Sequence, residues 1–550
     1  MIETSIREQV LLTCRRILSH LNRDPATTSN GCFDRRYWAW KLADFPEATF
    51  QRNVAPLAWY LKQEEVQDKS VLTRWIINAL LFSAHIQHRD GSFDQAYPFE
   101  RSYGATAFLL PDLIGAYEAI STSLSHQEND RILACITRAA DFLSTHSEHH
   151  GLISNHVAGA ALGLLQASNL SGKNMYKQKS DEIVGMIISN QSTEGWFPEY
   201  GGADPGYQTL CMYYLAQIYR LQPTRQLREG LEKSLAFLSF FAHPDGSFGG
   251  EYGSRRTEIY YPGGIALLAD EFPHAAALAD RMNWSISKGL TTTILDVDFG
   301  NTAPLLSNYI LALEAPPPPA SSESLPCDSH YVRQDFKSAG ISIYARQSYY
   351  AIAGTSNGGV LKVFDKDLKK ILLDDCGLLG ITKRRNLITS QCIDPKSEIS
   401  ADADRLHIQS RLCFVPTTRP TPFNYLLLRL ANLTFMRIPL LNEWVKKLLV
   451  KTLIKKDDFI PIYRTRKIEF SDEKIKIVDQ IEKKVGTDLV ELRMGIKFSA
   501  IHMASARYFS LQQINAPDAI ELDCNIFNHT GSITQSLQID FGKHTVERIL

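Results

Sequence analysis

Apolar positions in the first 310 residues recur with the spacing of amphipathic helices. Between Ser70 and His88 they fall three or four residues apart, at Val71, Leu72, Trp75, Ile76, Ala79, Leu80 and Phe82. The segments 158–167, 210–221 and 231–241 follow the same spacing. A period near 3.6 residues predicts helices with one buried face.

The loops between these helices form a weak repeat in which glycine precedes an aromatic or apolar residue. They cover residues 30–33, 90–93, 150–153, 194–197 and 245–248, and Asp298-Phe299-Gly300 is a degenerate sixth member. Successive glycines, at positions 31, 91, 151, 195, 246 and 300, lie 60, 60, 44, 51 and 54 residues apart. Each interval fits one helix pair, so residues 1–313 predict either an open solenoid or a closed ring. We favour the ring, an (α/α)6 toroid whose loops share one end, and we expect the function at that end.

The pattern changes after Glu314. Residues 314–328 are rich in proline and serine, which is typical of a linker. Short alternating runs follow, which predict strands. They lie at 341–346, 349–354, 358–364, 406–416, 465–470, 474–481 and 519–526. We therefore expect a multidomain α+β protein, with an antiparallel β-sandwich over residues 329–550.

One segment of the predicted β-domain, residues 424–456, is helical in pattern and basic. It carries seven Lys or Arg residues against Glu443 alone. Two interpretations are open: a helix pair on an anionic membrane surface, or a helical insertion packed on the toroid with its basic face in water. We favour the second.

Composition narrows the class of protein. The chain has 59 basic and 60 acidic residues, which does not favour nucleic acid as a partner. The nine cysteines are scattered and lack a C-x-x-C pair, so neither a disulfide framework nor a zinc site is expected. The N-terminus lacks the apolar core of a signal peptide, and no apolar run is long enough to span a membrane. These features predict a cytoplasmic protein; they leave the oligomeric state open.

The third and fourth loops carry candidate chemistry. Asn155 and His156 start a predicted helix, where Asn offers a neutral donor to a carboxylate and His titrates near neutral pH. The alternative is an Asn that caps the helix and a His that only packs. The fourth loop is long and contains Glu199, Tyr200 and Tyr207. Tyr207 follows His156 by 51 residues, one repeat, so the two should be neighbours on the rim.

The second and fifth loops add charged and aromatic side chains to the same end. Tyr252 lies close to Arg255 and Arg256, and arginine suits bidentate recognition of carboxylates. The alternative is a structural network with Glu251 or Glu258. Arg101 and Tyr103 belong to the second loop. Four such loops on one face predict a carbohydrate-sized cleft.

An Asn-His pair followed one repeat later by a Gly-rich loop between two tyrosines resembles the toroid-plus-β-sandwich polysaccharide lyases. The alginate lyase and heparinase II/III-like families are the most similar. The linker and the first part of the β-domain, from residues 336–341 to residues 373–377, are also similar to these lyases. The resemblance implies an enzyme that cleaves an acidic poly- or oligosaccharide containing uronate.

The same resemblance implies roles for the site. Asn155 neutralises the uronate carboxylate, and His156 and Tyr207 are the base and acid of a β-elimination. Arg101, Tyr103, Glu199, Tyr200, Tyr252, Arg255 and Arg256 bind substrate. The His-x-His-x-Asp run that often holds a metal in heparinase II/III-like proteins is absent, so we expect no metal and no cofactor. Because no signal peptide is recognised, we expect the protein to act in polysaccharide synthesis inside the cell. Residues 424–456 would then contact the membrane.

Three alternatives are open. A uronyl C5-epimerase would share the first proton transfer. A glycan-binding or assembly protein would keep the toroid without turnover. An isoprenoid-binding toroid is disfavoured, because the chain lacks a D-x-D-D motif and a convincing zinc ligand set.

Overall fold

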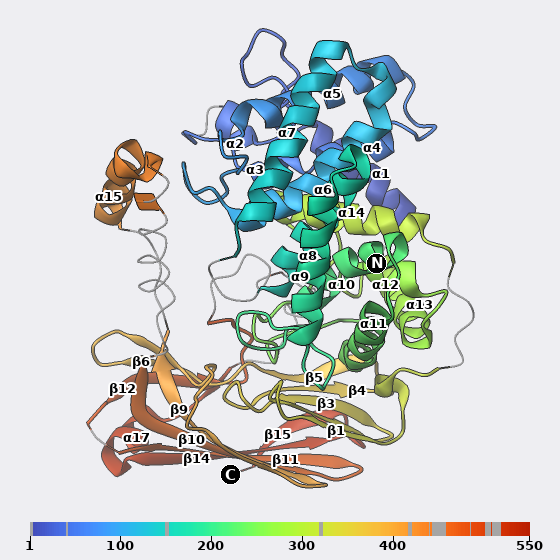
Figure 1. Ribbon diagram of the computed structural model, residues 1–550. Coiled ribbons are helices and arrows are strands. Elements are labelled where there is room, and N and C mark those ends of the chain that lie inside the picture. The colour runs from blue at the N-terminus through green and yellow to red at the C-terminus, as the bar shows by residue number, and fades with distance from the viewer. Residues whose placement is uncertain are drawn as a thin grey trace.

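The computed structural model describes residues 4–39, 42–148, 153–317, 323–415, 421–438, 441–442, 458–484, 486–500, 508 and 519–549. Figure 1 shows a helical domain above two stacked β-sheets, with one helix, α15, at the side.

The helical domain is a closed double ring. Its inner helices are α4 (Val54–Tyr60), α6 (Tyr103–Ile120), α8 (Ser154–Ser171), α10 (Pro205–Leu221), α12 (Pro262–Leu268) and α14 (Phe299–Glu314). Each contacts the next, and α14 returns to α4. The outer helices are α1 (Ile6–Leu18), α5 (Lys69–Ile86), α7 (His126–Thr145), α9 (Asn174–Ser189), α11 (Arg225–Leu238) and α13 (Pro273–Lys288). Helix α1 contacts both α13 and α14, which closes the ring. The predicted (α/α)6 toroid is confirmed.

Short helical segments complete this domain. They are α2 (Arg35–Trp38), α3 (Ala48–Gln51) and the 3-10 turns η1 (Ser121–Ser123) and η2 (Ser239–Phe241).

Burial explains which helices lie inside. Outer helices such as α11 carry one apolar stripe, here Leu227, Leu231, Leu235 and Leu238. Inner helices bury residues on several sides, and small residues let them approach closely. A Cβ on Gly159 of α8 would lie 2.9 Å from Phe108 of α6. The glycine is therefore part of the contact between these two helices.

The repeated glycines have one backbone conformation. Gly31, Gly91, Gly195 and Gly246 have φ between 89° and 96°. A Cβ at the first three would lie 2.0–2.2 Å from a carbonyl oxygen of an outer helix, on Asn78 of α5, Arg138 of α7 and Lys233 of α11. Only glycine fits such a position. The repeat is confirmed at these four glycines; Gly151 lies outside the described residues.

The sixth predicted loop is different. Gly300 belongs to α14, and Asp298 caps that helix by accepting hydrogen bonds from the N–H groups of Gly300 and Asn301. This part of the prediction was wrong, because an Asp two residues before a glycine is also a helix-cap pattern.

The β-domain is a sandwich, as predicted. After η3 (Pro326–Asp328), one antiparallel sheet runs in sequence order through β1 (Val332–Phe336), β2 (Ile341–Ala345), β3 (Tyr349–Gly354), β4 (Val360–Asp365) and β5 (Lys370–Asp375). Alternate residues separate its two faces. Ile343, Ile352 and Phe364 pack into the toroid core, whereas Tyr344 and Ala351 pack against the second sheet.

The second sheet has ten strands among the described residues. Its order is β13 (Ile520–Glu521), β12 (Leu489–Met494), β6 (Leu379–Thr382), β7 (Leu387–Thr389), β9 (Arg405–Phe414), β10 (Phe459–Phe470), β11 (Lys474–Lys483), β14 (Ser532–Asp540) and β15 (Thr545–Ile549), and β8 (Glu398–Ala401) pairs with β9. Strands β10 and β11 alternate buried and exposed positions, as expected for a sheet with one face in solvent.

Two details differ from the predictions within 329–550. The run 519–526 holds only the short β13, and α17 (Cys524–Thr530) follows, because Asp523 caps its first N–H groups. In the predicted insertion, α15 (Pro422–Leu433) and the 3-10 turn η4 (Phe435–Arg437) are described, while 439–440 and 443–456 lie outside the described residues. No described helix is long and apolar enough to cross a bilayer.

The loop end of the toroid meets the first sheet. The Glu194 carboxylate, in the fourth glycine loop, accepts hydrogen bonds from the backbone N–H groups of Ser338 and Ala339 in the β1–β2 turn. The Tyr350 hydroxyl donates to the Phe240 carbonyl. The fourth and fifth units are thus held against the β-domain. The domain limits 1–313, 314–328 and 329–550 stay a prediction.

Candidate active site

His156 is held at the start of α8 by three neighbours. Its Nδ1 lies 2.8 Å from the Glu148 carboxylate, which is 6% exposed. Phe108 packs edge-on against the imidazole, with ring centroids 5.1 Å apart. A Cβ on Gly104 would lie 2.7 Å from the same Nδ1, so a glycine is needed beside the ring. A carboxylate can only accept here, which places a proton on Nδ1 and leaves Nε2 unprotonated in the neutral ring.

His156 lines a pocket of about 210 Å³ on the loop end of the toroid. The pocket gathers side chains from the second, third and fourth units: Gln95, Tyr97, Glu100, Arg101, Ser102, Tyr103, Gly104, Phe142, His146, Ser147, Glu148, His156 and Tyr200. Four of the predicted site residues, Arg101, Tyr103, His156 and Tyr200, therefore share one pocket.

Arg101 and Tyr103 flank the second loop. The Arg101 backbone is left-handed, with φ 54°, and its guanidinium lies 2.6 Å from Asp90. Tyr103 begins α6 after the cap Ser102. Burial, assisted by Glu148, raises the pKa of the Tyr103 hydroxyl. This phenol therefore stays protonated at neutral pH and can donate a hydrogen bond.

Asn155 lies deeper, beside Glu199. Both side chains are almost fully buried, and the Asn155 amide donates to the Glu199 carboxylate at 2.8 Å. Helix α8 has Ile153 at its cap position, so Asn155 does not cap it. Burial, with the nearby Asp204, raises the pKa of Glu199 to about 8, although Arg255 and Asn155 oppose this shift. The pair is therefore largely uncharged at neutral pH.

Tyr200 and Arg255 form a stacked pair at the edge of the pocket. The Arg255 guanidinium carbon lies 3.7 Å from the centre of the Tyr200 ring. The backbone N–H of Arg255 donates to Asp204, which also caps α10 through the N–H of Tyr207. Asp204 thus fixes the fourth and fifth loops to each other. Partial burial raises the pKa of Tyr200 to about 12 despite the neighbouring Arg255.

Tyr207 stands apart from the pocket. It is half-buried in the first turn of α10 and packs against the toroid core. Its phenol lies within electrostatic range of Tyr261 and Tyr508. Neither Tyr207 nor Asn155 lines the pocket around His156.

Tyr252 and Arg256 are turned toward the β-domain. Arg256 is 4% exposed and donates to the Gln391 carbonyl at 2.9 Å. The backbone of Arg256 is left-handed, with φ 59°, and its side chain points away from that of Arg255. The Tyr252 hydroxyl lies 2.9 Å from Nε2 of His243, and both side chains are buried. These two residues sit between the domains and away from the pocket.

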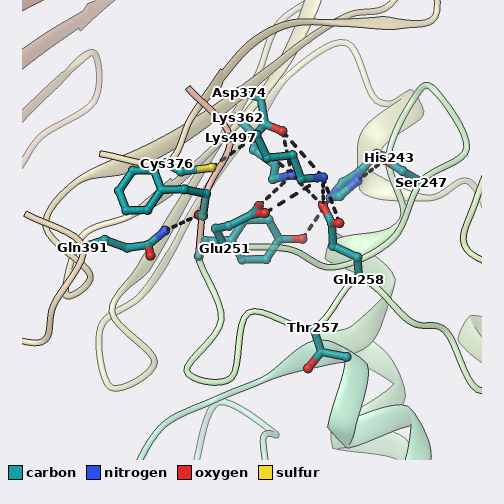
Figure 2. A network of polar contacts seen from close by, with 12 residues as sticks. His243, Ser247, Glu251, Thr257, Glu258, Lys362, Asp374, Cys376, Gln391 and Lys497 are labelled. Carbon is teal, nitrogen blue, oxygen red and sulfur yellow. Dashed lines mark hydrogen bonds and ion pairs between the residues drawn. The ribbon is translucent and has the colours of Figure 1, made fainter. Parts of the chain in front are cut away.

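A buried ion-pair network surrounds Tyr252. Figure 2 shows Lys362 and Lys497 between the carboxylates of Glu251, Glu258 and Asp374. Lys362 lies on the toroid side of β4, 2.9 Å from Glu251 and 3.1 Å from Glu258. Burial opposes the charge on Glu258, but Lys497 and Lys362 lower its pKa to about 2. The predicted network around Glu251 and Glu258 exists, with lysines in place of arginines.

This network includes a group of residues with the spacing of metal ligands. Among the described residues, Glu251, Asp374 and Cys376 place potential ligand atoms within 4.8 Å of one another. The Lys362 ammonium lies 2.9 Å from Glu251 and 3.2 Å from Asp374. A fixed positive charge at this position repels a cation, so these residues fit an ion-pair network and do not fit a metal site.

The sequence did not indicate several pocket residues. Glu148, His146 and Tyr97 line the pocket. Glu148 and His146 follow α7 just before the third loop, in a run of polar residues without a motif. The one available signal was their position at the loop end of the ring, which all three share with the predicted residues.

The sequence was compared with family models and with curated proteins. Residues 54–266 match the family model of the ulvan lyase N-terminal domain. No curated protein matches the chain by sequence.

Two solved structures share the fold. The Streptomyces coelicolor A3 chondroitin AC lyase, in complex with chondroitin sulphate, matches with a TM-score of 0.54 and 11% identity, over 89% of this chain and 67% of its own. A Paenibacillus xanthan lyase matches with a TM-score of 0.53 and 11% identity, over 88% of this chain and 46% of its own. The chain thus spans about half the length of the xanthan lyase. The predicted resemblance to toroid-plus-β-sandwich polysaccharide lyases is confirmed: the chain shares its fold with the chondroitin AC lyase and the xanthan lyase, and residues 54–266 match the ulvan lyase N-terminal domain.

Proposed function

We propose that the chain is a polysaccharide lyase that acts on a uronate-containing poly- or oligosaccharide. A base removes the proton at C5, the C4–O4 bond breaks, and the leaving oxygen takes up a proton, which leaves a C4=C5 double bond. The observation that carries this proposal is the pocket in which His156, oriented by Glu148, meets Arg101, Tyr103 and Tyr200. These side chains lie within or beside the segment that matches the ulvan lyase domain.

His156 serves as the base. Glu148 holds the proton on Nδ1, so Nε2 is available to accept the C5 proton. As Nε2 becomes protonated, the Glu148 carboxylate stabilises the imidazolium that forms. Glu148 is thus a positioning residue, because it acts on the substrate only through His156.

Asn155 neutralises the uronate carboxylate. Proton removal next to a carboxylate creates a second negative charge, which needs preorganised donors. An amide carries two N–H donors, and Glu199 accepts from one of them. The resemblance to the lyases assigns the other to the substrate, although Asn155 is almost fully buried and does not line the pocket around His156. Because Glu199 is largely protonated at neutral pH, the pair does not repel an anionic sugar.

A tyrosine protonates the leaving oxygen. Tyr207 is the residue that the family pattern indicates. Tyr200 lines the pocket with His156, and its pKa of about 12 keeps it protonated as an acid must be. We retain Tyr207 as the family-based assignment and treat Tyr200 as its competitor in the same experiment. Arg255, stacked on Tyr200, and Arg101 bind sugar carboxylates.

The test is turnover on a panel of uronate polymers: ulvan, chondroitin sulphate, xanthan and alginate. We expect an ultraviolet-absorbing unsaturated uronate from at least one polymer, and its loss in His156→Ala. Tyr200→Phe and Tyr207→Phe identify the acid. It is the tyrosine whose replacement abolishes turnover while the polymer still binds.

Two outcomes would replace the lyase. Deuterium incorporation at C5 without cleavage would assign a uronyl C5-epimerase. Binding of a polymer with neither cleavage nor exchange would assign a glycan-binding or assembly protein.

A further inference from the structure

Helix α15 exposes its apolar face to solvent. Phe423, Leu426, Leu427, Leu430 and Leu433 form one stripe, at the spacing of a helix face, and their side chains are 48–66% exposed. Asn432, on the opposite side, is buried, and Arg429, which flanks the stripe, pairs with Asp44 of the toroid at 3.0 Å. A helix that packs stably on a protein normally places its apolar stripe inward. Most of the predicted basic face belongs to residues 443–456, outside the described residues, so it stays a prediction; the difference found in α15 is that its apolar stripe faces away from the toroid.

The exposed apolar surface continues beyond α15. Phe435, Ile438 and Leu441 are 40–51% exposed. Contiguous apolar patches of this kind mark a binding surface for a protein or a membrane.

Charge selects between these two occupants. Residues 424–456 contain Arg429, Arg437, Lys446, Lys447, Lys451, Lys455 and Lys456 against Glu443 alone. A second copy of the same chain would bring an equally basic segment to the contact, and like charges repel. An anionic lipid surface attracts basic residues and receives apolar side chains at its headgroup boundary.

The segment is also connected to the candidate pocket. The Arg437 carbonyl accepts a hydrogen bond from the Arg101 guanidinium, and the Arg437 side chain lies over the Phe99 ring. The Asn442 amide donates to the Phe99 carbonyl. Arg101 lines the pocket, so this segment directly contacts a pocket residue.

We propose that α15 and η4, residues 421–438, bind the surface of an anionic lipid bilayer and hold the pocket next to it. This goes beyond the proposed function, because it concerns where the site is held and would stand for a lyase, an epimerase or a binding protein. It predicts that glycans close to a membrane reach the pocket more readily than free polymer.

Vesicle flotation of the full chain tests the proposal. The vesicles are phosphatidylcholine alone or phosphatidylcholine with about one third phosphatidylglycerol. We expect flotation with the anionic vesicles, at least tenfold weaker binding for the double variant Leu426→Ser/Leu430→Ser, and weakening by salt. Leu12→Ser is the control, since Leu12 on α1 is equally exposed, at 50%, and lies outside the segment. It should float like the parent chain.

Three results would overturn the proposal. The first is failure of the parent chain to float with anionic vesicles. The second is a binding pattern without specificity: the parent binds phosphatidylcholine alone equally well, or the double variant binds as the parent does. The third is a parent oligomer, seen by light scattering, that dissociates in the double variant. This result would identify a second copy of the chain as the occupant. Turnover on short soluble oligosaccharides should be equal in the parent and the double variant. This measurement tests the proposed catalytic function independently of membrane binding.

Discussion

The Glu148 carboxylate lies 2.8 Å from Nδ1 of His156, eight positions further along the chain. Glu148 is also close enough to Tyr103 and Tyr200 to raise the pKa of both phenols. One buried carboxylate therefore influences the base and two potential proton donors. It is the feature that most separates this pocket from a simple sugar-binding surface.

Replacing Glu148 with Gln should lower kcat by up to about 100-fold with little change in KM, because a small misplacement of a catalytic group can cost about this much. Steady-state kinetics on an active polymer would measure the split. Asp130→Asn is the control, since Asp130 makes a similar contact with His126 on the exposed face of α7. A parallel rise in KM would instead show that Glu148 acts in substrate binding.

Glu199 should make the stability of the toroid depend on pH. Its pKa is about 8 in the folded chain and near 4.5 when unfolded, so the folded state holds the proton more tightly. The contribution to stability is complete below about pH 4.5 and is lost as pH rises toward 8. Glu199→Gln stays neutral throughout, so its Tm, measured by calorimetry at pH 5 and pH 8, should change less than that of the parent. Identical pH dependence would mean that Glu199 is ionised when folded.

The ring was predictable because its determinants are local. A glycine at φ near 90° lies against a carbonyl of an outer helix at Gly31, Gly91 and Gly195, so the same residue recurs in these units. The strands of the first sheet were predictable for the same kind of reason, since alternate residues face two different cores.

The site was less predictable because it depends on paths between elements. Arg255 and Arg256 are adjacent, yet the left-handed backbone of Arg256 sends one to Tyr200 and the other to Gln391. The contact between Glu148 and His156 joins the residues after α7 to the start of α8, and no sequence pattern indicates it. The contacts of Arg429 with Asp44 and of Arg437 with Arg101 join segments far apart in the sequence, which no helical pattern can show.

The two arginines should therefore respond differently to the same change. Arg255→Gln should raise KM by about tenfold, since a charged hydrogen bond to substrate contributes about 1.5–3 kcal/mol, and should leave Tm nearly unchanged. Arg256→Gln should instead lower the free energy of unfolding by about 1–3 kcal/mol, because it leaves the buried Gln391 carbonyl without this donor. Kinetics and thermal melts on both variants would measure this. A large KM effect from Arg256→Gln at unchanged Tm would reverse the assignment.

The glycine loops offer a test of the ring. Gly195→Ala should destabilise the chain by at least about 2 kcal/mol, since it combines φ 96° with a Cβ 2.2 Å from the Lys233 carbonyl. Gly185→Ala in α9 meets no atom within 4 Å and should stabilise by up to about 1 kcal/mol, because alanine favours the helix. Denaturant unfolding would compare the two. Similar losses for both would mean that the close contact at Gly195 is relieved by local movement.

The network between the domains should be strongly coupled. Lys362→Met removes the cation that lies between Glu251, Glu258 and Asp374, and breaking such a buried group commonly costs about 3–5 kcal/mol. Burial raises the pKa of Glu251, so this carboxyl is the one most easily replaced by a neutral group. Adding Glu251→Gln to Lys362→Met should therefore recover part of the loss, and a double-mutant cycle of unfolding free energies would measure the coupling. Strict additivity of the two substitutions would show that Lys497 alone neutralises the cluster. In that case Lys362 would matter only for packing on the toroid side of β4.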